Sequence, residues 1–431
     1  MNWREVYKNK IVSADEAVKQ IKSGNRVLVG HACGEPTALV DAMVRRAPEL
    51  RNVELVHMVS MGKAEYCKPE MAENFHFNSC FVGATTRMAV SSGRGDYLPC
   101  FFFEMPSLLT TRNLLDVALI QVTPPNENGD CSYGISCDYT EAGVRNPNTI
   151  VIIQINTKMP YTFGTSLNLS RANFIVEVEQ ELIELQPPKI GELEEKIGKN
   201  VASLVDDGAT LQLGIGAIPD AVLHFLGERK NLGIHSEMFS DGVVKLAREG
   251  VINNSKKTLH NGKFVASFLM GTKVLYDFVD KNPDVLVFPI DYVNDPFINS
   301  QNENLISINS TIQVDLQGAL NSEAIGTEQF SGIGGQVDFI RGANRSKGGK
   351  AIIALPSTAK GGTISKIVSR LDPGSPVTTS RYDSRIIVTE YGIADLYGLN
   401  LRQRAKALIN IAHPKFREEL EREAWEDRNL R

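Results

Sequence analysis

The order of apolar and polar positions repeats once along the chain. Each copy contains an amphipathic helix, a short apolar strand, a turn that contains glycine and a second helix. The first copy has these elements at 13–24, 26–30, 31–36 and from 37, and the second at 197–208, 210–214, 215–219 and from 220. Apolar strands that alternate with amphipathic helices are typical of parallel sheets with helices on their faces. The pattern therefore predicts an α/β protein of two similarly folded α/β domains with mainly parallel sheets.

Each copy then runs into another strand, predicted at 52–62 and 231–242. When the closing residues Gly62 and Gly242 are aligned, His57 takes the position of Glu237, so only the second copy carries a carboxylate there. Ligands of α/β proteins bind at the carboxyl ends of strands. A partly desolvated carboxylate at such an end can act as a general base or as a covalent nucleophile. Glu237 is therefore the candidate catalytic residue, and an ordinary solvated loop glutamate is the alternative.

Further apolar runs place the remaining strands and the domain boundary. Two prolines, Pro187 and Pro188, interrupt the pattern between polar neighbours, which predicts domains at 1–186 and 187–431. The tail reads as two helices, at 404–412 and from Pro414. Additional strands are predicted at 117–122, 149–155, 285–290, 351–355 and 385–390.

A glycine-containing turn lies between the second copy's first strand and its second helix. We expect Pro219 at the first helical position, so that the preceding N–H groups point outward without a partner. Such groups can bind a phosphate, a thioester carbonyl or an oxyanion, although the glycines could also merely tighten the turn. The spacing differs from the dinucleotide motif G-x-G-x-x-G, so NAD is not favoured. The turn residues are Gly214, Ile215, Gly216, Ala217 and Ile218.

Three other positions are weaker candidates. The loop 331–335 ends in Gly334 and Gly335, which would let the backbone approach a ligand closely. Lys360 precedes two glycines and could meet a phosphate or a carboxylate, and Glu390 is a second carboxylate at a strand end, or simply a solvated edge. The chain has neither a Walker motif nor the G-x-S-x-G motif of α/β hydrolases.

Composition removes several classes of partner. The chain of 431 residues is 42% hydrophobic and 23% charged, with a net charge of −5, which gives no argument for a nucleic-acid or anionic-membrane partner, and neither is expected. Its longest apolar stretches, such as 285–290, are too short to span a bilayer, and the N-terminus lacks an apolar signal segment. A cytoplasmic location is expected. The 6 cysteines form no C-x-x-C pair and the 7 histidines are scattered, so no metal site is predicted.

Several motifs in one order carry a resemblance over the whole length of the chain. The chain resembles the acetyl-CoA hydrolase/CoA-transferase family, and within it the 4-hydroxybutyrate CoA-transferases and their butyryl-CoA:acetate relatives. The motifs are Ile11–Ala17, Leu213–Asp220, Ser236–Gly242, Phe330–Phe339, Val388–Ala394 and Ile411–Arg417.

The resemblance implies a role for each candidate. Glu237 would be the nucleophile that becomes a glutamyl-CoA thioester, and Gly334 or Gly335 would donate an N–H to the oxyanion hole, with Glu390 in a supporting role. Gly214 to Ile218 would line the coenzyme A site, with Gly334, Gly335 and Lys360 as further contacts. The active site is expected at the interface of the two domains, and the protein is expected to form a homodimer or higher homo-oligomer. Acyl-CoA and coenzyme A are then substrates, and no tightly bound cofactor is expected.

The implied reaction moves coenzyme A between 4-hydroxybutyryl-CoA or butyryl-CoA and acetate, with propionate and succinate as further candidate acids. A hydrolase of acetyl-CoA or another acyl-CoA would use the same glutamate and admit water. A ligand sensor or a sugar-phosphate isomerase on a related fold is less favoured, since an isomerase needs a base paired with phosphate-binding Lys or Arg loops. The acyl preference stays open, because one methylene is worth only about 1–3 kcal/mol of discrimination.

Overall fold

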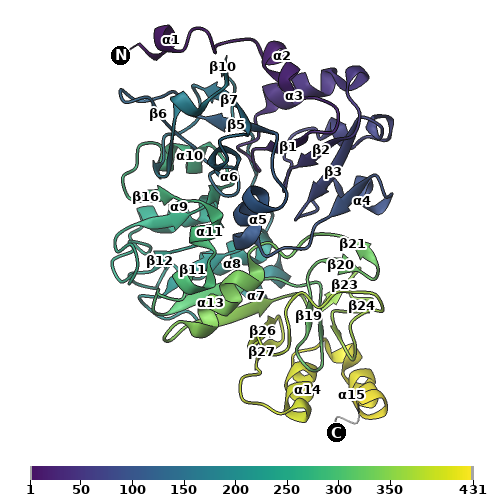
Figure 1. Cartoon of the computed structure of the whole chain (residues 1–431). Coiled ribbons are helices and arrows are strands. Elements are labelled where there is room, and N and C mark those ends of the chain that lie inside the picture. The colour runs from purple at the N-terminus through teal and green to yellow at the C-terminus, as the bar shows by residue number, and fades with distance from the viewer. Residues whose placement is uncertain (1, 429–431) are drawn as a thin grey trace. The chain divides into compact units, whose positions relative to one another are not determined.

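The computed structural model describes residues 2–428, which form two compact units (Figure 1). The first unit contains the residues up to 185 together with 265–293, and the second contains 186–264 and the residues from 294 onward. The continuous domains expected from the sequence, 1–186 and 187–431, differ from this division in the segment 265–293. That segment belongs to the unit formed by residues up to 185, from which it is separated in the sequence by residues 186–264.

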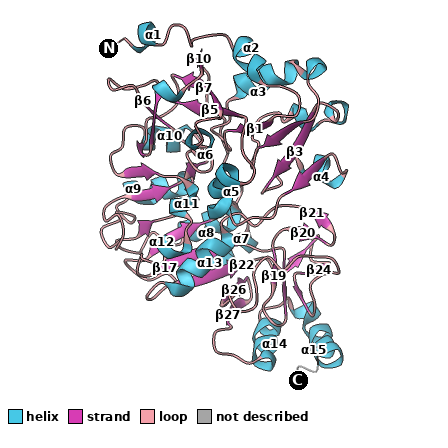
Figure 2. Cartoon of the chain, in the orientation of Figure 1, coloured by secondary structure: helices cyan, strands magenta, loops and turns pink. Residues whose placement is uncertain are grey.

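The first unit is built on a parallel sheet with the order β10-β7-β5-β1-β2-β3-β4 (Figure 2). All six residues of β5 are buried, as expected for a central strand covered on both faces. The predicted strands at 26–30, 117–122 and 149–155 are confirmed. The strands are β1 (Arg26–Val29), β2 (Val53–Val56), β3 (Phe75–Ser79), β4 (Gly95–Tyr97), β5 (Val117–Val122), β7 (Ile150–Asn156) and β10 (Phe174–Val178).

The helices of the first unit are short, except for α3. The predicted helix at 13–24 begins where expected, because the Ser13 hydroxyl accepts the N–H of Glu16 at 3.2 Å. It turns into a 3₁₀ helix after Ala17 and ends at Gln20. The helices are α1 (Trp3–Val6), α2 (Ala14–Ala17), α3 (Thr37–Arg45), α4 (Arg87–Ser91), α5 (Met105–Thr111), α6 (Ala142–Arg145), α10 (Lys273–Val279) and α11 (Ile290–Val293).

Shorter strands complete the first unit. β6 pairs antiparallel with β9, and β16 pairs parallel with β8. The strand predicted at 285–290 is therefore confirmed only in its first half, after which the chain enters α11. The bounds are β6 (Asp130–Ser132), β8 (Phe163–Gly164), β9 (Ser166–Asn168) and β16 (Val285–Val287).

The second unit contains a mixed sheet with the order β13-β11-β17-β22-β26-β27, and β12 also pairs with β11. The four strands β11, β17, β22 and β26 are parallel, whereas β13 and β27 run antiparallel to their neighbours. The strands are β11 (Thr210–Leu213), β12 (Gly233–Ile234), β13 (Met238–Phe239), β17 (Leu305–Asn309), β22 (Lys350–Ala354), β26 (Ile386–Thr389) and β27 (Gly392–Asp395).

The two sheets share a strand order, which confirms the predicted repeat. The order β10-β7-β5-β1-β2 in the first unit matches β26-β22-β17-β11-β12 in the second when each set is taken in chain order. In both units the first of these strands lies beside the second. The third, fourth and fifth strands follow in order on the other side of the first strand. The described residues thus form two α/β units with mainly parallel sheets.

The helices of the second unit flank this sheet. Helix α13 packs against β17 and β22, and α7 packs against β26 and α8. The helix predicted at 197–208 starts earlier, because Glu194 accepts the N–H of Gly191 at 2.9 Å and caps α7 there. The tail helices are confirmed as α14 and α15. The helices are α7 (Glu192–Ala202), α8 (Ala217–His224), α9 (Asp241–Arg248), α12 (Pro296–Asn299), α13 (Gln336–Arg345), α14 (Leu401–Asn410) and α15 (Pro414–Arg428).

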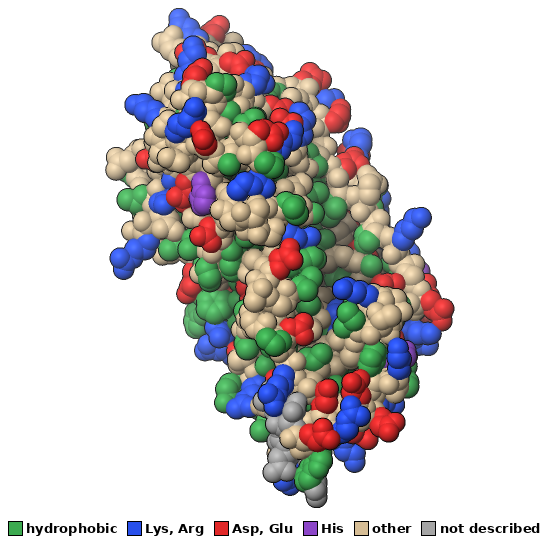
Figure 3. Space-filling model, turned by 90° about the vertical axis from the view of Figure 1, so that its right-hand side faces the viewer, with side chains coloured by type: hydrophobic (Ala, Val, Ile, Leu, Met, Phe, Trp, Pro, Cys, Tyr) green, Lys and Arg blue, Asp and Glu red, His purple; other side chains and the backbone are tan. Residues whose placement is uncertain are grey.

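Surface charge is mixed in sign. Figure 3 shows Lys and Arg side chains interspersed with Asp and Glu side chains over one face of the molecule. Within residues 2–428, no helix combines the length and the apolar character needed to cross a membrane.

Candidate active site

Glu237 lies between β12 and β13, two short strands that both pair with β11. The strand predicted at 231–242 is thus broken at the candidate residue. On one side of Glu237, the Ser236 hydroxyl accepts the N–H of Leu213 at 3.1 Å. On the other side, Met238 stands opposite Leu213 in the antiparallel register. Ser236 and Met238 are buried, so the backbone of Glu237 is fixed to the end of β11 while its side chain is partly exposed.

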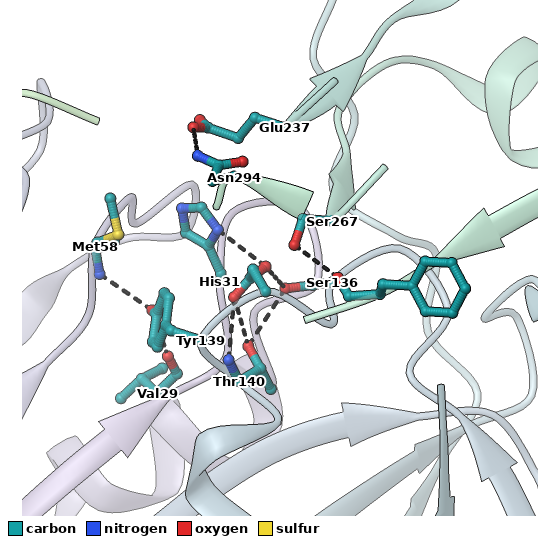
Figure 4. Close-up of polar contacts among 11 residues, drawn as sticks. Val29, His31, Met58, Ser136, Tyr139, Thr140, Glu237, Ser267 and Asn294 are labelled. Atoms are coloured by element: carbon teal, nitrogen blue, oxygen red, sulfur yellow. Dashed lines mark hydrogen bonds and ion pairs between the residues drawn. The ribbon is translucent and has the colours of Figure 1, made fainter. Parts of the chain in front are cut away.

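Asn294 provides the hydrogen bond that defines the site. Its Nδ2 donates to Glu237 Oε2 at 2.9 Å and to Asp338 Oδ2 at 3.3 Å. Figure 4 shows the amide of Asn294 pointing toward the Glu237 carboxylate. Asn294 and Asp338 are both buried. An amide donor at this distance stabilises negative charge on the carboxylate oxygen.

Asn294 was not predicted from the sequence as a site residue. A signal for the local structure was present, because Asn294 is followed by Asp295 and Pro296, a helix-start pattern. Asp295 caps α12 by accepting the N–H of Phe297 at 2.7 Å. The contact of Asn294 with Glu237 has no local signal, because the two residues are 57 positions apart.

Gly335 lies against the Glu237 carboxylate. A Cβ atom at Gly335 would overlap both Glu237 Oε2 and Asn294 Nδ2. Gly335 is the N-cap of α13 and has φ −89°, whereas Gly334 has φ +51°, in the left-handed region. Gly334 is therefore required for its conformation and Gly335 for space. The structure brings Gly335 and Glu237 together as the sequence suggested, and a role in the oxyanion hole stays a prediction.

The turn before α8 differs from the prediction in one respect. Gly216, with φ +121°, is the N-cap, and α8 begins at Ala217. Placing Pro219 at the first helical position was wrong, because Gly216 turns the chain earlier and Pro219 becomes the third helical residue. The N–H groups of Ala217 and Ile218 lie in the first turn and so have no acceptor within the helix. Together with the exposed Ile215 (53% exposed), they form the end of the turn that begins at Gly214.

Glu390 and Lys360 lie at other points of the second unit. Glu390 follows β26 and accepts both the N–H (2.9 Å) and the hydroxyl (2.5 Å) of Ser357. Burial lowers the pKa of Lys366 to about 8, and the Glu390 charge opposes this shift. Lys360 is exposed in the turn between β23 (Thr358–Ala359) and β24 (Ile364–Ser365). The roles proposed for Glu390 and Lys360 stay predictions.

In the first unit, His57 follows β2, in a position similar to that of Glu237 in the second unit. Its Nδ1 is 2.7 Å from the Tyr66 hydroxyl. Complete burial, and secondarily the charge of His31, lower the pKa of His57 to about 3, so this imidazole is neutral at ordinary pH. Nδ1 of His31 lies 3.1 Å from Asp138 Oδ2. Of the two copies, only the second therefore has a carboxylate at this point.

Among residues 2–428, no group of three or more His, Cys, Asp or Glu side chains is placed to hold a metal ion.

Two protein-family models match the chain. The model of the acetyl-CoA hydrolase/transferase N-terminal domain matches residues 1–185, and that of the C-terminal domain matches residues 271–424. The chain belongs to the acetyl-CoA hydrolase/transferase family. The resemblance drawn from the sequence motifs is thus confirmed.

Relatives within the acetyl-CoA hydrolase/transferase family align over nearly the whole chain. The chain is 58% identical to a 4-hydroxybutyrate coenzyme A transferase of Clostridium kluyveri, over 97% of this chain and 98% of the relative. It is 37% identical to a butyryl-CoA:acetate CoA-transferase of Anaerostipes caccae, over 98% of each chain. The crystal structure of a 4-hydroxybutyrate CoA-transferase from Porphyromonas gingivalis is 44% identical and superposes with a TM-score of 0.85, over 98% of this chain and 99% of that one.

Proposed function

We propose that this protein is an acyl-CoA:carboxylate CoA-transferase in which Glu237 is the nucleophile. The observation that carries the proposal is the placement of the Glu237 carboxylate between the Asn294 amide donor and the Gly335 backbone at the end of β11. The relatives with the longest alignments are transferases by name. Their names also suggest the substrates, so coenzyme A would move between 4-hydroxybutyryl-CoA or butyryl-CoA and acetate.

The reaction proceeds in four steps. A carboxylate oxygen of Glu237 attacks the thioester carbonyl, the C–S bond breaks, and the coenzyme A thiolate leaves behind an acyl-glutamyl anhydride. The thiolate then attacks the glutamyl carbonyl, the C–O bond breaks, and the donor acid departs as a carboxylate. The enzyme is left as a glutamyl-CoA thioester. Acetate reverses both steps, which regenerates Glu237 and releases acetyl-CoA.

Asn294 has a distinct part in this sequence. When the thiolate attacks the glutamyl carbonyl, negative charge develops on an oxygen of Glu237 itself. Nδ2 of Asn294 already lies 2.9 Å from Oε2, so it can stabilise that charge without reorganisation. A preorganised donor of this kind is worth about 3–4 kcal/mol in the transition state. The charge on the substrate carbonyl needs other donors, for which we propose the N–H of Gly335 or Gly334 and the first turn of α8.

Other parts of the proposal rest on the family resemblance. Gly214 to Ile218, Gly334, Gly335 and Lys360 are proposed to bind coenzyme A, and Glu390 is proposed to support the site. A cytoplasmic homo-oligomer without a tightly bound cofactor, and a site at the domain interface, also stay predictions.

The acceptor dependence of thiol release tests the proposal against a hydrolase. With butyryl-CoA and acetate, we expect acetyl-CoA to form with ping-pong kinetics, seen as parallel double-reciprocal lines. Without acetate, thiol release should stop after at most one equivalent per site, because the anhydride and the thioester are shielded from water. Glu237→Ala is the control and should form no acetyl-CoA. Continuous thiol release at the same rate without acetate, and no acetyl-CoA, would show that the enzyme is a hydrolase.

A further inference from the structure

Asp338 is a buried carboxylate that the reaction scheme does not use. It is the third residue of α13, and its side chain is almost completely buried. Its Oδ2 accepts a hydrogen bond from Asn294 Nδ2 at 3.3 Å. Burying a carboxylate is costly unless hydrogen bonds or charges compensate. Asp338 lies one hydrogen-bonded residue away from the proposed nucleophile.

The amide group of Asn294 is shared between two carboxylates. One N–H points to Glu237 and the other to Asp338. A rotation of the amide by half a turn would place Oδ1 against the same acceptors, and oxygen cannot donate to them. Oδ1 is buried, and none of the described residues donates a hydrogen bond to it. The acceptors on the Nδ2 side therefore set the orientation of this amide.

The backbone of Asn294 is held independently of Asp338. The side chain of Asn299 donates to the main-chain oxygen of Asn294 at 3.1 Å. Asn299 itself occupies the space left by Gly342 of α13, where a Cβ atom would overlap its Oδ1. Rotation of the terminal amide is then the remaining freedom of Asn294 that bears on Glu237.

We propose that Asp338 is a positioning residue, which accepts one N–H of Asn294 and thereby keeps the other N–H directed at Glu237. The inference rests on the proposed function, because the orientation matters only if charge develops on the glutamyl oxygen. Without the acceptor, a fraction of the molecules has the amide oxygen facing Glu237. Those molecules lack the donor that the glutamyl oxyanion needs.

Asp338 could instead act on Glu237 through its charge alone, and two substitutions separate the two effects. Asp338→Asn removes the charge but keeps an oxygen that can accept from Asn294. Asp338→Leu has a similar size and removes both the charge and the acceptor. Because both variants lack the charge, any difference in activity between them is due to the hydrogen-bond acceptor.

The experiment measures turnover, KM and the pH dependence of kcat/KM with butyryl-CoA and acetate. We expect Asp338→Asn to stay within about 3-fold of the wild type, and Asp338→Leu to lose about 10-fold or more in kcat with little change in KM, with the loss of about 100-fold for complete removal of one oxyanion donor as the limit. The acid limb of the kcat/KM profile should lie at higher pH in Asp338→Leu than in Asp338→Asn. The reason is that Glu237 loses a donor to its ionised form.

A variant on the same helix serves as the control for general loosening of α13. Asn344→Ala removes a hydrogen bond from α13 to the main-chain oxygen of Asp383 (2.6 Å) and should leave kcat unchanged. Asp338→Ala is a second variant without an acceptor. Equal turnover and equal acid limbs in Asp338→Asn and Asp338→Leu would overturn the inference. It would also be overturned if neither acceptor-free variant folds while Asp338→Asn does, since the hydrogen-bond acceptor would then be needed for folding itself.

The wild type separates failure of the inference from failure of the proposed function. If acyl-CoA followed by borohydride modifies Glu237, the nucleophile is established, and equal Asp338 variants contradict only the positioning role. If active wild-type enzyme is not modified at Glu237, the proposed function itself fails.

Discussion

At the scale of single residues, the space around Glu237 is set by the absence of a side chain at Gly335. A Cβ atom there would overlap Glu237 Oε2 and Asn294 Nδ2. The backbone of Gly335 has φ −89° and ψ 7°, which an alanine can adopt without strain. A substitution at this position therefore tests the geometry of the carboxylate rather than the conformation of the loop.

We predict that Gly335→Ala lowers kcat by about 100-fold or more, because the added methyl group displaces the carboxylate from its attacking position. Gly227→Ala is the matched control, since a Cβ atom at that glycine of the second unit would meet no atom within 4 Å. The measurement is turnover of both variants, with thermal melting as the test of folding. Near wild-type turnover in a folded Gly335→Ala enzyme would place the reacting carboxylate elsewhere.

At this scale the sequence named Glu237 and Gly335 as candidates, because both belong to motifs with a recognisable spacing, and the structure places them close together. The sequence did not identify Asn294, whose contact depends on the packing of α12 against α13. The position expected for Pro219 was wrong by two residues, since the positive φ of Gly216 starts α8 earlier. Contacts between distant segments and single backbone angles are set by tertiary packing, which local patterns do not report.

At the scale of elements, helices α12 and α13 meet through a glycine and an asparagine. Gly342 leaves the space that the Asn299 side chain fills, and Asn299 holds the main-chain oxygen of Asn294.

We predict that Gly342→Ala destabilises the fold by about 1–3 kcal/mol through overpacking. Asn299→Ala should recover part of this loss, because it vacates the contested space. Urea unfolding of both single variants and the double variant measures the coupling, and strict additivity would contradict the contact.

Short strand β12, which leads into Glu237, is held by a buried lysine. Nζ of Lys257 donates to the main-chain oxygens of Ile234 and Lys263, each at 2.7 Å. Burial lowers the pKa of Lys257 from 10.5 to about 7. Between these two values the unfolded chain binds a proton that the folded chain does not. The contribution of Lys257 to stability is therefore largest at high pH and declines as the pH falls toward about 7.

We predict that the wild type loses stability relative to Lys257→Met as the pH is lowered from about 10 to about 7, with no further relative change below that. Methionine has a similar length and does not titrate, so it removes the proton-linked term. Urea unfolding at several pH values in this range gives the difference in the free energy of unfolding. A difference that does not depend on pH would show that Lys257 keeps its ordinary pKa in the folded protein.

The elements that were predicted correctly coincide with uninterrupted apolar or amphipathic runs, whereas shorter elements, and also β17 and α13, were not predicted. Strands β5, β7 and β22 and helices α3, α14 and α15 lie close to the predicted bounds. The run at 231–242 reads as one strand, yet the structure divides it into β12 and β13 around Glu237. The reason is that β12 and β13 pair with β11 in opposite directions, which a pattern of hydrophobicity does not encode.

At the scale of the molecule, the shared strand order of the two units agrees with the repeat in the sequence. The assignment of 265–293 to the first unit was not predictable, because it depends on pairings such as Leu286 of β16 with Phe163 of β8. Because of the repeat, residues at corresponding positions of the two copies can be compared, and they differ where Glu237 lies. The first has a buried neutral histidine after its second strand and the second has the carboxylate, so we propose that the chemistry takes place in the second.

The central claim is that Glu237 becomes covalently attached to coenzyme A, and trapping the intermediate tests it most directly. The enzyme is incubated with butyryl-CoA without an acceptor and then treated with borohydride, which reduces a thioester to an alcohol. Glu237→Asp is the control, because its carboxylate is drawn back by one methylene from Asn294 and should neither react nor turn over. We expect mass spectrometry to find the reduced residue at Glu237 in the wild type. Modification of another residue, or none in an active preparation, would contradict it.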